Sequence, residues 1–177
     1  MIDINAVTYR NINPDDYAQI EGIESNEGDY DDAFIIEELE EIFSRDDSFV
    51  SYSGLVAEYQ GRVIGYLIYF KPNMTIAAKQ KVIMRLHVTE DVRRQGVGSE
   101  LVQRIEPTKV GHKVNIEVGL EDYVPAAFYK SNGYTVIGII EAEYDEDGEM
   151  EMEGYMILQN EKKEAMTLKN RLTWKAN

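Results

Sequence analysis

Arg93-Arg94-Gln95-Gly96-Val97-Gly98-Ser99-Glu100-Leu101 is the most informative stretch of this chain. It follows an apolar run at 82–88, and it opens a segment at 98–106 whose apolar residues recur at helical spacing. A strand, a glycine loop and a helix N-terminus in this order direct several backbone N–H groups at one point. Without side chains at Gly96 and Gly98, phosphate oxygens can approach the backbone closely. The stretch predicts a pyrophosphate site, although a Gly-x-Gly before a helix can also be only a tight turn.

The segments on either side of this stretch predict a mixed fold. An α+β domain is expected, because hairpins flank a central strand-helix-strand-helix crossover, and this order gives a mixed, mostly antiparallel sheet with helices on both faces. Strands are predicted at 6–12, 49–59, 63–70, 82–88, 114–118, 134–144 and 149–158, and helices at 13–20, 31–45, 98–106 and 123–131.

Composition excludes several kinds of chemistry. The 177 residues include no cysteine and two histidines, so disulfides and thiolate nucleophiles are excluded and no metal site is expected. The N-terminus lacks a basic region followed by an apolar one, and no run approaches the roughly 18 apolar residues of a membrane span. A cytoplasmic protein without a membrane partner is the expectation.

The charge is unevenly distributed. The formal net charge is −15, which argues against nucleic acid as a partner because its phosphates would be repelled. Residues 1–60 carry 16 acidic and 2 basic side chains, whereas residues 61–138 carry 7 acidic and 11 basic ones. Residues 139–159 carry 8 acidic side chains and no basic one. A cationic middle therefore lies between two anionic segments.

Two motifs resemble those of the GNAT superfamily of N-acetyltransferases. Arg93-x-x-Gly96-x-Gly98 is similar to its Gln/Arg-x-x-Gly-x-Gly/Ala signature, and Leu86-His87-Val88-Thr89 before it is similar to the family's fourth strand. Residues 126–134, Ala-Ala-Phe-Tyr-Lys-Ser-Asn-Gly-Tyr, resemble the second signature. The resemblance implies the acyl-CoA N-acyltransferase fold, with the sheet splayed between its fourth and fifth strands. It also implies one domain at 1–160, with 161–177 as an extension that is helical or a subunit contact, as in a homodimer.

The resemblance further implies acetyl-CoA as co-substrate. The exposed backbone of the fourth strand would pair with pantetheine, and the loop backbone would hold the pyrophosphate. Asp122 falls where many members carry Asn, and a carboxylate cannot donate a hydrogen bond as an amide does. The implied cofactor-binding residues are Leu86, His87, Val88, Arg93, Arg94, Gln95, Gly96, Val97, Gly98, Ser99, Asp122 and Tyr129.

Two residues are the leading catalytic candidates. Tyr129 matches the family tyrosine that protonates the departing thiolate. Glu117 interrupts an apolar strand and aligns with a glutamate that acts as base in the branch acetylating ribosomal-protein N-termini; an outward-facing strand glutamate is the alternative. His87 is a second candidate base. Without a cysteine or a Ser-His-Asp set, direct transfer in a ternary complex is the simpler chemistry.

The acceptor is expected to be a cationic amine, such as a polyamine, an aminoglycoside or a peptide amine. In the family, the acceptor cleft lies between the loop joining the first two helices and the last hairpin, and both segments are acidic here. General solubility is the alternative explanation of these charges, and an idle acyl-CoA-binding module is the alternative function. The facing acidic residues would be Glu21, Glu24, Glu27, Asp29, Asp31, Asp32, Glu141, Glu143, Asp145, Glu146 and Asp147.

Overall fold

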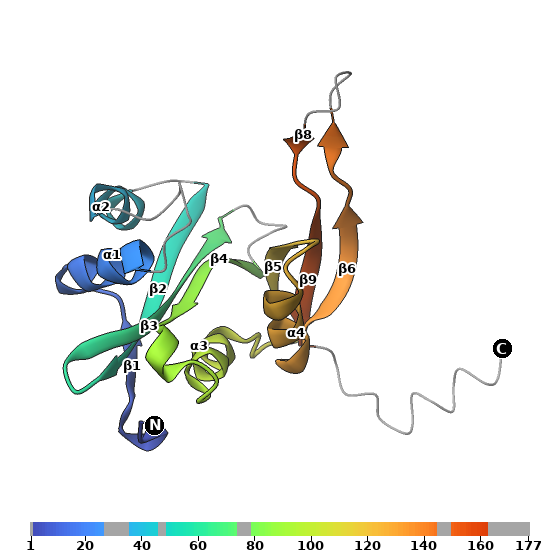
Figure 1. The fold of residues 1–177 in the computed structure, drawn as a ribbon. Helices are drawn as coiled ribbons and strands as arrows, with labels where there is room; N and C mark the ends of the chain where they lie inside the picture. The colour runs from blue at the N-terminus through green and yellow to red at the C-terminus, as the bar shows by residue number, and fades with distance from the viewer. Residues whose placement is uncertain (1, 27–35, 46–48, 74–78, 145–149, 163–177) are drawn as a thin grey trace.

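A seven-stranded mixed sheet forms the centre of the computed structural model (Figure 1). The structure describes residues 2–26, 36–45, 49–73, 79–144 and 150–162. Neighbouring strands are antiparallel except β4 and β5, which are parallel. The strand order is β1 (Thr8–Asn11), β2 (Val50–Tyr59), β3 (Arg62–Pro72), β4 (Gln80–Val88), β5 (Lys113–Gly119), β9 (Tyr155–Glu161) and β6 (Thr135–Ile140), and β7 (Glu143–Tyr144) pairs separately with β8 (Met150–Met152).

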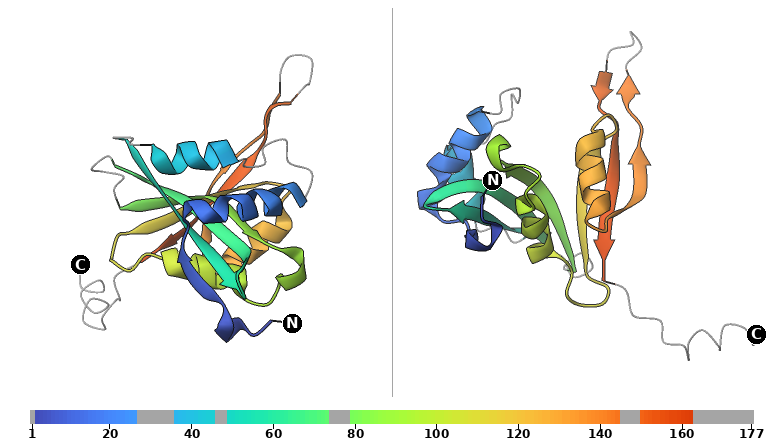
Figure 2. Two further views of the ribbon diagram at one scale, coloured as in Figure 1. Left: turned by 90° about the vertical axis from the view of Figure 1, so that its left-hand side faces the viewer. Right: turned by 60° about the horizontal axis from the view of Figure 1, so that its bottom comes forward.

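Helices cover both faces of the sheet, as the sequence predicts. Alternate residues of β3 enter two different cores: Leu67 packs under α3, whereas Tyr66 and Ile68 pack under α1 and α2. Figures 1 and 2 show this arrangement of helices. The helices are α1 (Tyr17–Asn26), α2 (Ile36–Ser44), α3 (Val97–Ile105) and α4 (Tyr123–Ser131), with short 3-10 turns η1 (Ile4–Ala6), η2 (Pro14–Asp16) and η3 (Glu90–Val92).

The predicted splay between the fourth and fifth strands is confirmed. β4 and β5 pair only through 80–82 and 113–115, and beyond these residues they separate (Figure 2, right). In the pairing of β3 with β4, Ile68 is opposite Arg85 and Tyr69 is opposite Ile83, so Met84 is an extra residue in a bulge. The paired residues are called the closed end below, and the diverging residues 83–88 and 116–119 are called the open end.

The first helix is longer than predicted. The sequence analysis ended it at Ile20, but α1 continues to Asn26. It continues because Tyr17, Ile20 and Ile23 form one buried stripe against β3, and this packing outweighs the unfavourable Gly22. The predicted helix at 31–45 is described from Ile36 to Ser44, and residues 163–177 of the predicted extension lie outside the described residues. Within the described residues, no helix is long and apolar enough to cross a membrane.

Candidate active site

The loop after β4 has the backbone conformation that an anion-binding turn needs. Arg94 has φ 60° and Gly96 has φ 94°, so the chain passes twice through the left-handed region before α3 begins. Gly96 caps α3 without a side-chain hydrogen bond. The N–H groups of the first helical turn, at 96–99, have no intrahelical acceptor, and the helix dipole adds positive potential at the same point. The predicted loop therefore offers backbone donors to an anion.

Two predicted cofactor-binding side chains hold this loop in place. Arg93 Nε donates to the Val88 carbonyl at 2.9 Å. Gln95 Oε1 accepts from the Ile2 N–H at 2.8 Å, and its Nε2 donates to the Asp91 carbonyl at 3.3 Å. These bonds tie the loop to the end of β4 and to the N-terminus of the chain. Arg94 is exposed.

The three predicted pantetheine-binding residues of β4 point to different faces of the sheet. Leu86 and Val88 pack against the core under α3. His87 is opposite Tyr66 on β3, and Tyr66 belongs to the core under α1 and α2. Within the described ranges, no strand pairs with the backbone of β4 at the open end on the β5 side. An extended, amide-containing ligand could use this free edge.

Tyr129 is buried on the other side of the splay. It lies in α4 and is 5% exposed, and its ring packs edge-on against Phe128 and Tyr134. Burial raises the pKa of Tyr129 well above its usual range, so the hydroxyl stays protonated at neutral pH. A Cβ at Gly98 would lie 3.4 Å from the Phe128 ring, so α4 adjoins the first turn of α3. Asp122, at the N-terminus of α4, is exposed.

A buried carboxylate that the sequence analysis did not single out as catalytic lies on the α1 side of β4. The Glu24 side chain is fully buried, and neither oxygen makes a hydrogen bond to a described residue. Its Oε1 is 3.5 Å from His87 Nδ1. The side chain of His87 is 15% exposed although Nδ1 is buried, so solvent reaches the rest of the ring.

The surroundings keep this histidine neutral. Burial lowers the pKa of His87, and Arg85 lowers it further, while Glu24 opposes the shift. The Tyr66 hydroxyl is also buried without a hydrogen bond to a described residue, and its ring is edge-on to His87 at 6.1 Å. A neutral imidazole beside a carboxylate can accept a proton. The sequence contains a signal for this position of Glu24. Tyr17, Ile20 and Glu24 are spaced to share one face of a helix, provided that the predicted helix continues beyond Ile20.

Glu117, the first candidate base, is exposed. It lies on β5 opposite Ile157 of β9, and its neighbours Ile116 and Val118 point into the core. The alternative of an outward-facing strand glutamate describes its position.

The acidic walls of the predicted acceptor cleft are only partly described. Glu21 accepts the Ile36 N–H at 3.4 Å, and Glu141 and Glu143 are exposed. Glu24 is buried rather than part of an open wall. Outside the described residues lie Glu27, Asp29, Asp31, Asp32, Asp145, Glu146 and Asp147.

A cavity of about 700 Å³ lies beside the loop on the α1 side. Gln19, Gly22, Arg62, Asp91 and Arg93 are among its lining residues. Arg62 closes one side through an ion pair to Asp91 at 2.6 Å. Across the described part of the chain, no group of three or more His, Asp and Glu side chains is arranged to hold a metal ion.

Comparison with known families and structures gives an independent result. Residues 51–136 match the family described as "Acetyltransferase (GNAT) domain". These residues include both motifs quoted above from the sequence. No sequence among the curated proteins matches the chain significantly.

Several solved structures share the fold. The ribosomal-protein-S18-alanine N-acetyltransferase from Escherichia coli superposes with a TM-score of 0.66 at 18% identity, covering 92% of this chain and 97% of that one. Ard1 from Thermoplasma volcanium gives 0.65 at 20% identity, covering 90% and 99%. Chaetomium thermophilum Naa20, solved in complex with a bisubstrate analogue, gives 0.64 at 20% identity, covering 95% and 90%. At these identities the likeness concerns the fold.

Proposed function

Since this chain belongs to the GNAT acetyltransferases, we propose that it transfers an acetyl group from acetyl-CoA directly to a primary amine, and that the amine is cationic. One observation carries the proposal. At the point where β4 and β5 separate, the uncapped first turn of α3 adjoins the helix that carries Tyr129. An anion-binding turn and a free strand edge therefore lie beside the helix that carries Tyr129.

The residues at the open end fit acetyl-CoA. The N–H groups at 96–99 would bind the pyrophosphate, and the free edge of β4 would pair with the pantetheine amides. When bound, acetyl-CoA supplies a thioester carbonyl that an amine can attack. The residues that would hold it are Leu86, His87 and Val88 through their backbone, and the loop Arg93–Ser99.

The proposed proton donor and the proposed proton acceptor lie on opposite sides of the splay. Tyr129 stays protonated at neutral pH and would donate to the departing sulfur. The attacking amine must lose a proton, and the pair Glu24–His87 is the better-placed acceptor because it is buried and its imidazole is neutral. In this arrangement Glu24 orients and stabilises the imidazole, and the solvent-exposed part of the ring takes the proton. Glu117 stays a competing proposal, since an exposed carboxylate can act through water.

The charge distribution supports a cationic acceptor. The chain carries −15 overall, and most of the excess acid lies before residue 61 and within 139–159. Glu141 and Glu143 are exposed on the hairpin that rises beyond the sheet (Figure 1). A field of this sign attracts ammonium groups and repels acidic substrates.

Thiol release from acetyl-CoA, measured over a panel of amines, tests the function. We expect turnover with at least one di- or polyamine or basic peptide. Its KM should rise steeply with ionic strength, because the Debye length falls from about 30 Å at 0.01 M to about 8 Å at 0.15 M. Binding of acetyl-CoA without turnover on any amine would contradict the transferase and favour a sensor. A salt-insensitive KM would reject only the cationic acceptor.

A further inference from the structure

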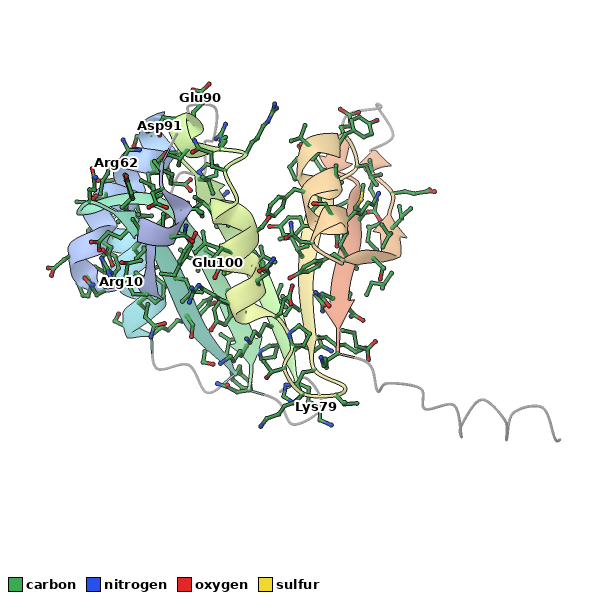
Figure 3. All side chains as sticks on the ribbon, turned by 90° about the horizontal axis from the view of Figure 1, so that it is seen from below. Arg10, Arg62, Lys79, Glu90, Asp91 and Glu100 are labelled. Carbon is green, nitrogen blue, oxygen red and sulfur yellow. The ribbon has the colours of Figure 1, made fainter. Side chains whose placement is uncertain are left out.

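Five lysines surround a second cavity, of about 200 Å³, at the closed end of the sheet. It lies beyond the C-terminus of α3, whereas the acetyl-CoA loop lies at the N-terminus of the same helix. Figure 3 shows Lys79 at the opposite end of the molecule from Glu90 and Asp91, which precede that loop. We call this cavity the lysine pocket and define it by Lys71, Lys79, Lys81, Lys109 and Lys113.

The fold gathers these lysines from separate parts of the sequence. Lys71 is the last but one residue of β3, Lys81 lies in β4, and Lys113 begins β5. The parallel pairing places Lys81 opposite Val114, and the Lys113 N–H donates to the Lys79 carbonyl at 2.9 Å. Lys109 comes from the loop after α3. The lysines are therefore fixed by the pairing at the closed end.

The positive charge in the pocket is not neutralised by the described part of the protein. None of the five lysines forms an ion pair with a described residue. Among the described residues that line the cavity, Glu106 is the one acidic residue. In a chain with 33 acidic side chains, this arrangement leaves a concentrated positive site.

Two of the ammonium groups contact the same aromatic ring. Lys71 Nζ is 5.8 Å and Lys81 Nζ is 5.4 Å from the centre of the same ring, that of Tyr69. Lys81 Nζ also donates to the Ile105 carbonyl, the last of α3, at 2.8 Å. Burial lowers the pKa of Lys81, and the charge of Lys71 lowers it further. An anion between them would relieve this repulsion.

The size and charge of the pocket define the chemistry of a ligand. Five lysines and one glutamate leave a net lining charge near +4, and two phosphate groups carry about −1.5 to −2 each. The volume suits a small ligand, and the overall charge of −15 disfavours a long nucleic acid. Lysines bind phosphate oxygens as point charges without a demanding geometry.

We propose that the lysine pocket binds a small anion with two linked phosphate groups, at the end of α3 opposite the acetyl-CoA loop. α3 has 9 residues, so its two ends are separated by about 13 Å. The proposal does not depend on the proposed acetyl transfer. A ligand there would contact Lys81 of β4 and Lys109 of the loop that leads into β5, and so would tie together the two halves of the sheet that diverge toward Tyr129.

Calorimetry with inorganic pyrophosphate at low ionic strength tests the proposal. Because pyrophosphate can also bind the first turn of α3, the titration uses Ser99→Glu, whose added carboxylate blocks that turn. We expect one site in this background. The double variant Lys79→Gln/Lys109→Gln, at two exposed positions, should bind at least about tenfold more weakly, from the loss of two ammonium contacts. The matched control is Arg104→Gln/Lys130→Gln, which removes two exposed charges elsewhere and should change the affinity less than about twofold.

Each outcome of these titrations either supports or overturns the lysine pocket as a phosphate site. No pyrophosphate binding in the Ser99→Glu background, or an equal loss in the control, overturns the proposal in favour of general charge attraction. Tighter binding of a short single-stranded RNA than of pyrophosphate also overturns it. If ADP binds more tightly than pyrophosphate, the ligand of the lysine pocket is a nucleotide. If pyrophosphate binds more tightly, the ligand is a free diphosphate. Both results support the pocket. None of these measurements depends on turnover.

Discussion

At the closed end of the sheet β4 and β5 are joined by backbone pairing, whereas at the open end the same two strands run apart. The described lining of the cavity at the closed end includes five lysines and no buried carboxylate. The open end carries a buried carboxylate, a neutral imidazole and a buried hydroxyl. The difference shows that one strand pair can supply rigidity at one end and unsatisfied polar groups for chemistry at the other.

Each end places its unusual groups by a different physical means. At the closed end, Lys71 of β3 and Lys81 of β4 contact the same ring, that of Tyr69, and the repulsion between these like charges costs free energy. At the open end, a bulge at Met84 and the absence of a neighbouring strand leave backbone groups free. Both arrangements lower the stability of the folded protein, and a bound ligand would restore it. We therefore expect a ligand at each end.

The largest expected effect is at the loop of the open end. Ser99→Glu should weaken acetyl-CoA binding by about 10³-fold, because the carboxylate occupies the position of a phosphate and removes several charge-assisted hydrogen bonds. An acidic residue in the first helical turn does not destabilise the helix, so the fold should persist. Calorimetry with acetyl-CoA is the measurement, and Ser99→Ala, which should bind within a few-fold of the parent, is the control. Equal affinities for Ser99→Glu and the parent would remove the loop from the cofactor site.

The next effect concerns the hydroxyl across the splay. Tyr129→Phe should lower kcat by about 10²-fold and leave the KM for acetyl-CoA nearly unchanged, because the ring remains and only the proton donor is lost. Tyr134→Phe removes a neighbouring buried hydroxyl whose ring is 5.4 Å away, and it should change kcat by less than about threefold. Steady-state thiol release measures both. Similar losses in the two variants would indicate a packing effect instead of proton donation.

The fold was more predictable from the sequence than the site. Strand and helix positions follow from local periodicity, and the two glycines of the loop identify the phosphate-binding turn. The predicted site residues came from motifs, which report backbone conformation well. They report side-chain direction poorly: His87 falls in the cofactor strand, yet its ring packs on the opposite face of the sheet from Leu86 and Val88.

Glu24 and the lysine pocket depend on tertiary structure. The predicted helix ended at Ile20, before Glu24, whereas packing carries α1 to Asn26. The excess of basic residues in the middle of the chain was visible in the sequence. Its concentration at one cavity was not, because Lys71, Lys81 and Lys113 meet only through the register of three strands.

A third prediction compares the two candidate proton acceptors. Glu24→Gln should lower kcat by about 10- to 100-fold, since His87 then loses the carboxylate that stabilises its protonated form. Glu117→Gln should lower kcat by less than about threefold, because this carboxylate is exposed. The melting temperature of Glu24→Gln should not fall, since the change removes an uncompensated buried charge. A larger kcat loss in Glu117→Gln would assign the base to β5.

The smallest expected effect is a pH dependence of stability that belongs to the open end. Burial lowers the pKa of His87 in the folded protein, while in the unfolded chain it has its ordinary value of about 6.5. Between these two values the unfolded state binds more protons. His87 therefore contributes stability that is complete above about pH 6.5 and decreases as the pH falls through that window. The loss approaches about 1.4 kcal/mol per pH unit for one proton.

Denaturant unfolding of the parent and of His87→Asn at about pH 8 and about pH 5.5 measures this contribution. The parent should lose about 1 kcal/mol more than the variant over that interval. Charged groups that act on the ring include Glu24 on α1 and Arg85 on β4, and the Tyr66 ring on β3 is edge-on to it. In the Glu24→Gln background the loss should begin at the same pH and continue further down, because the group that opposes the shift is gone. His112→Gln, at the closed end, is the matched control and should retain the His87 contribution. Parallel pH profiles for the parent and His87→Asn would show that the open end does not hold a neutral imidazole, and the proton acceptor would then have to be sought on β5.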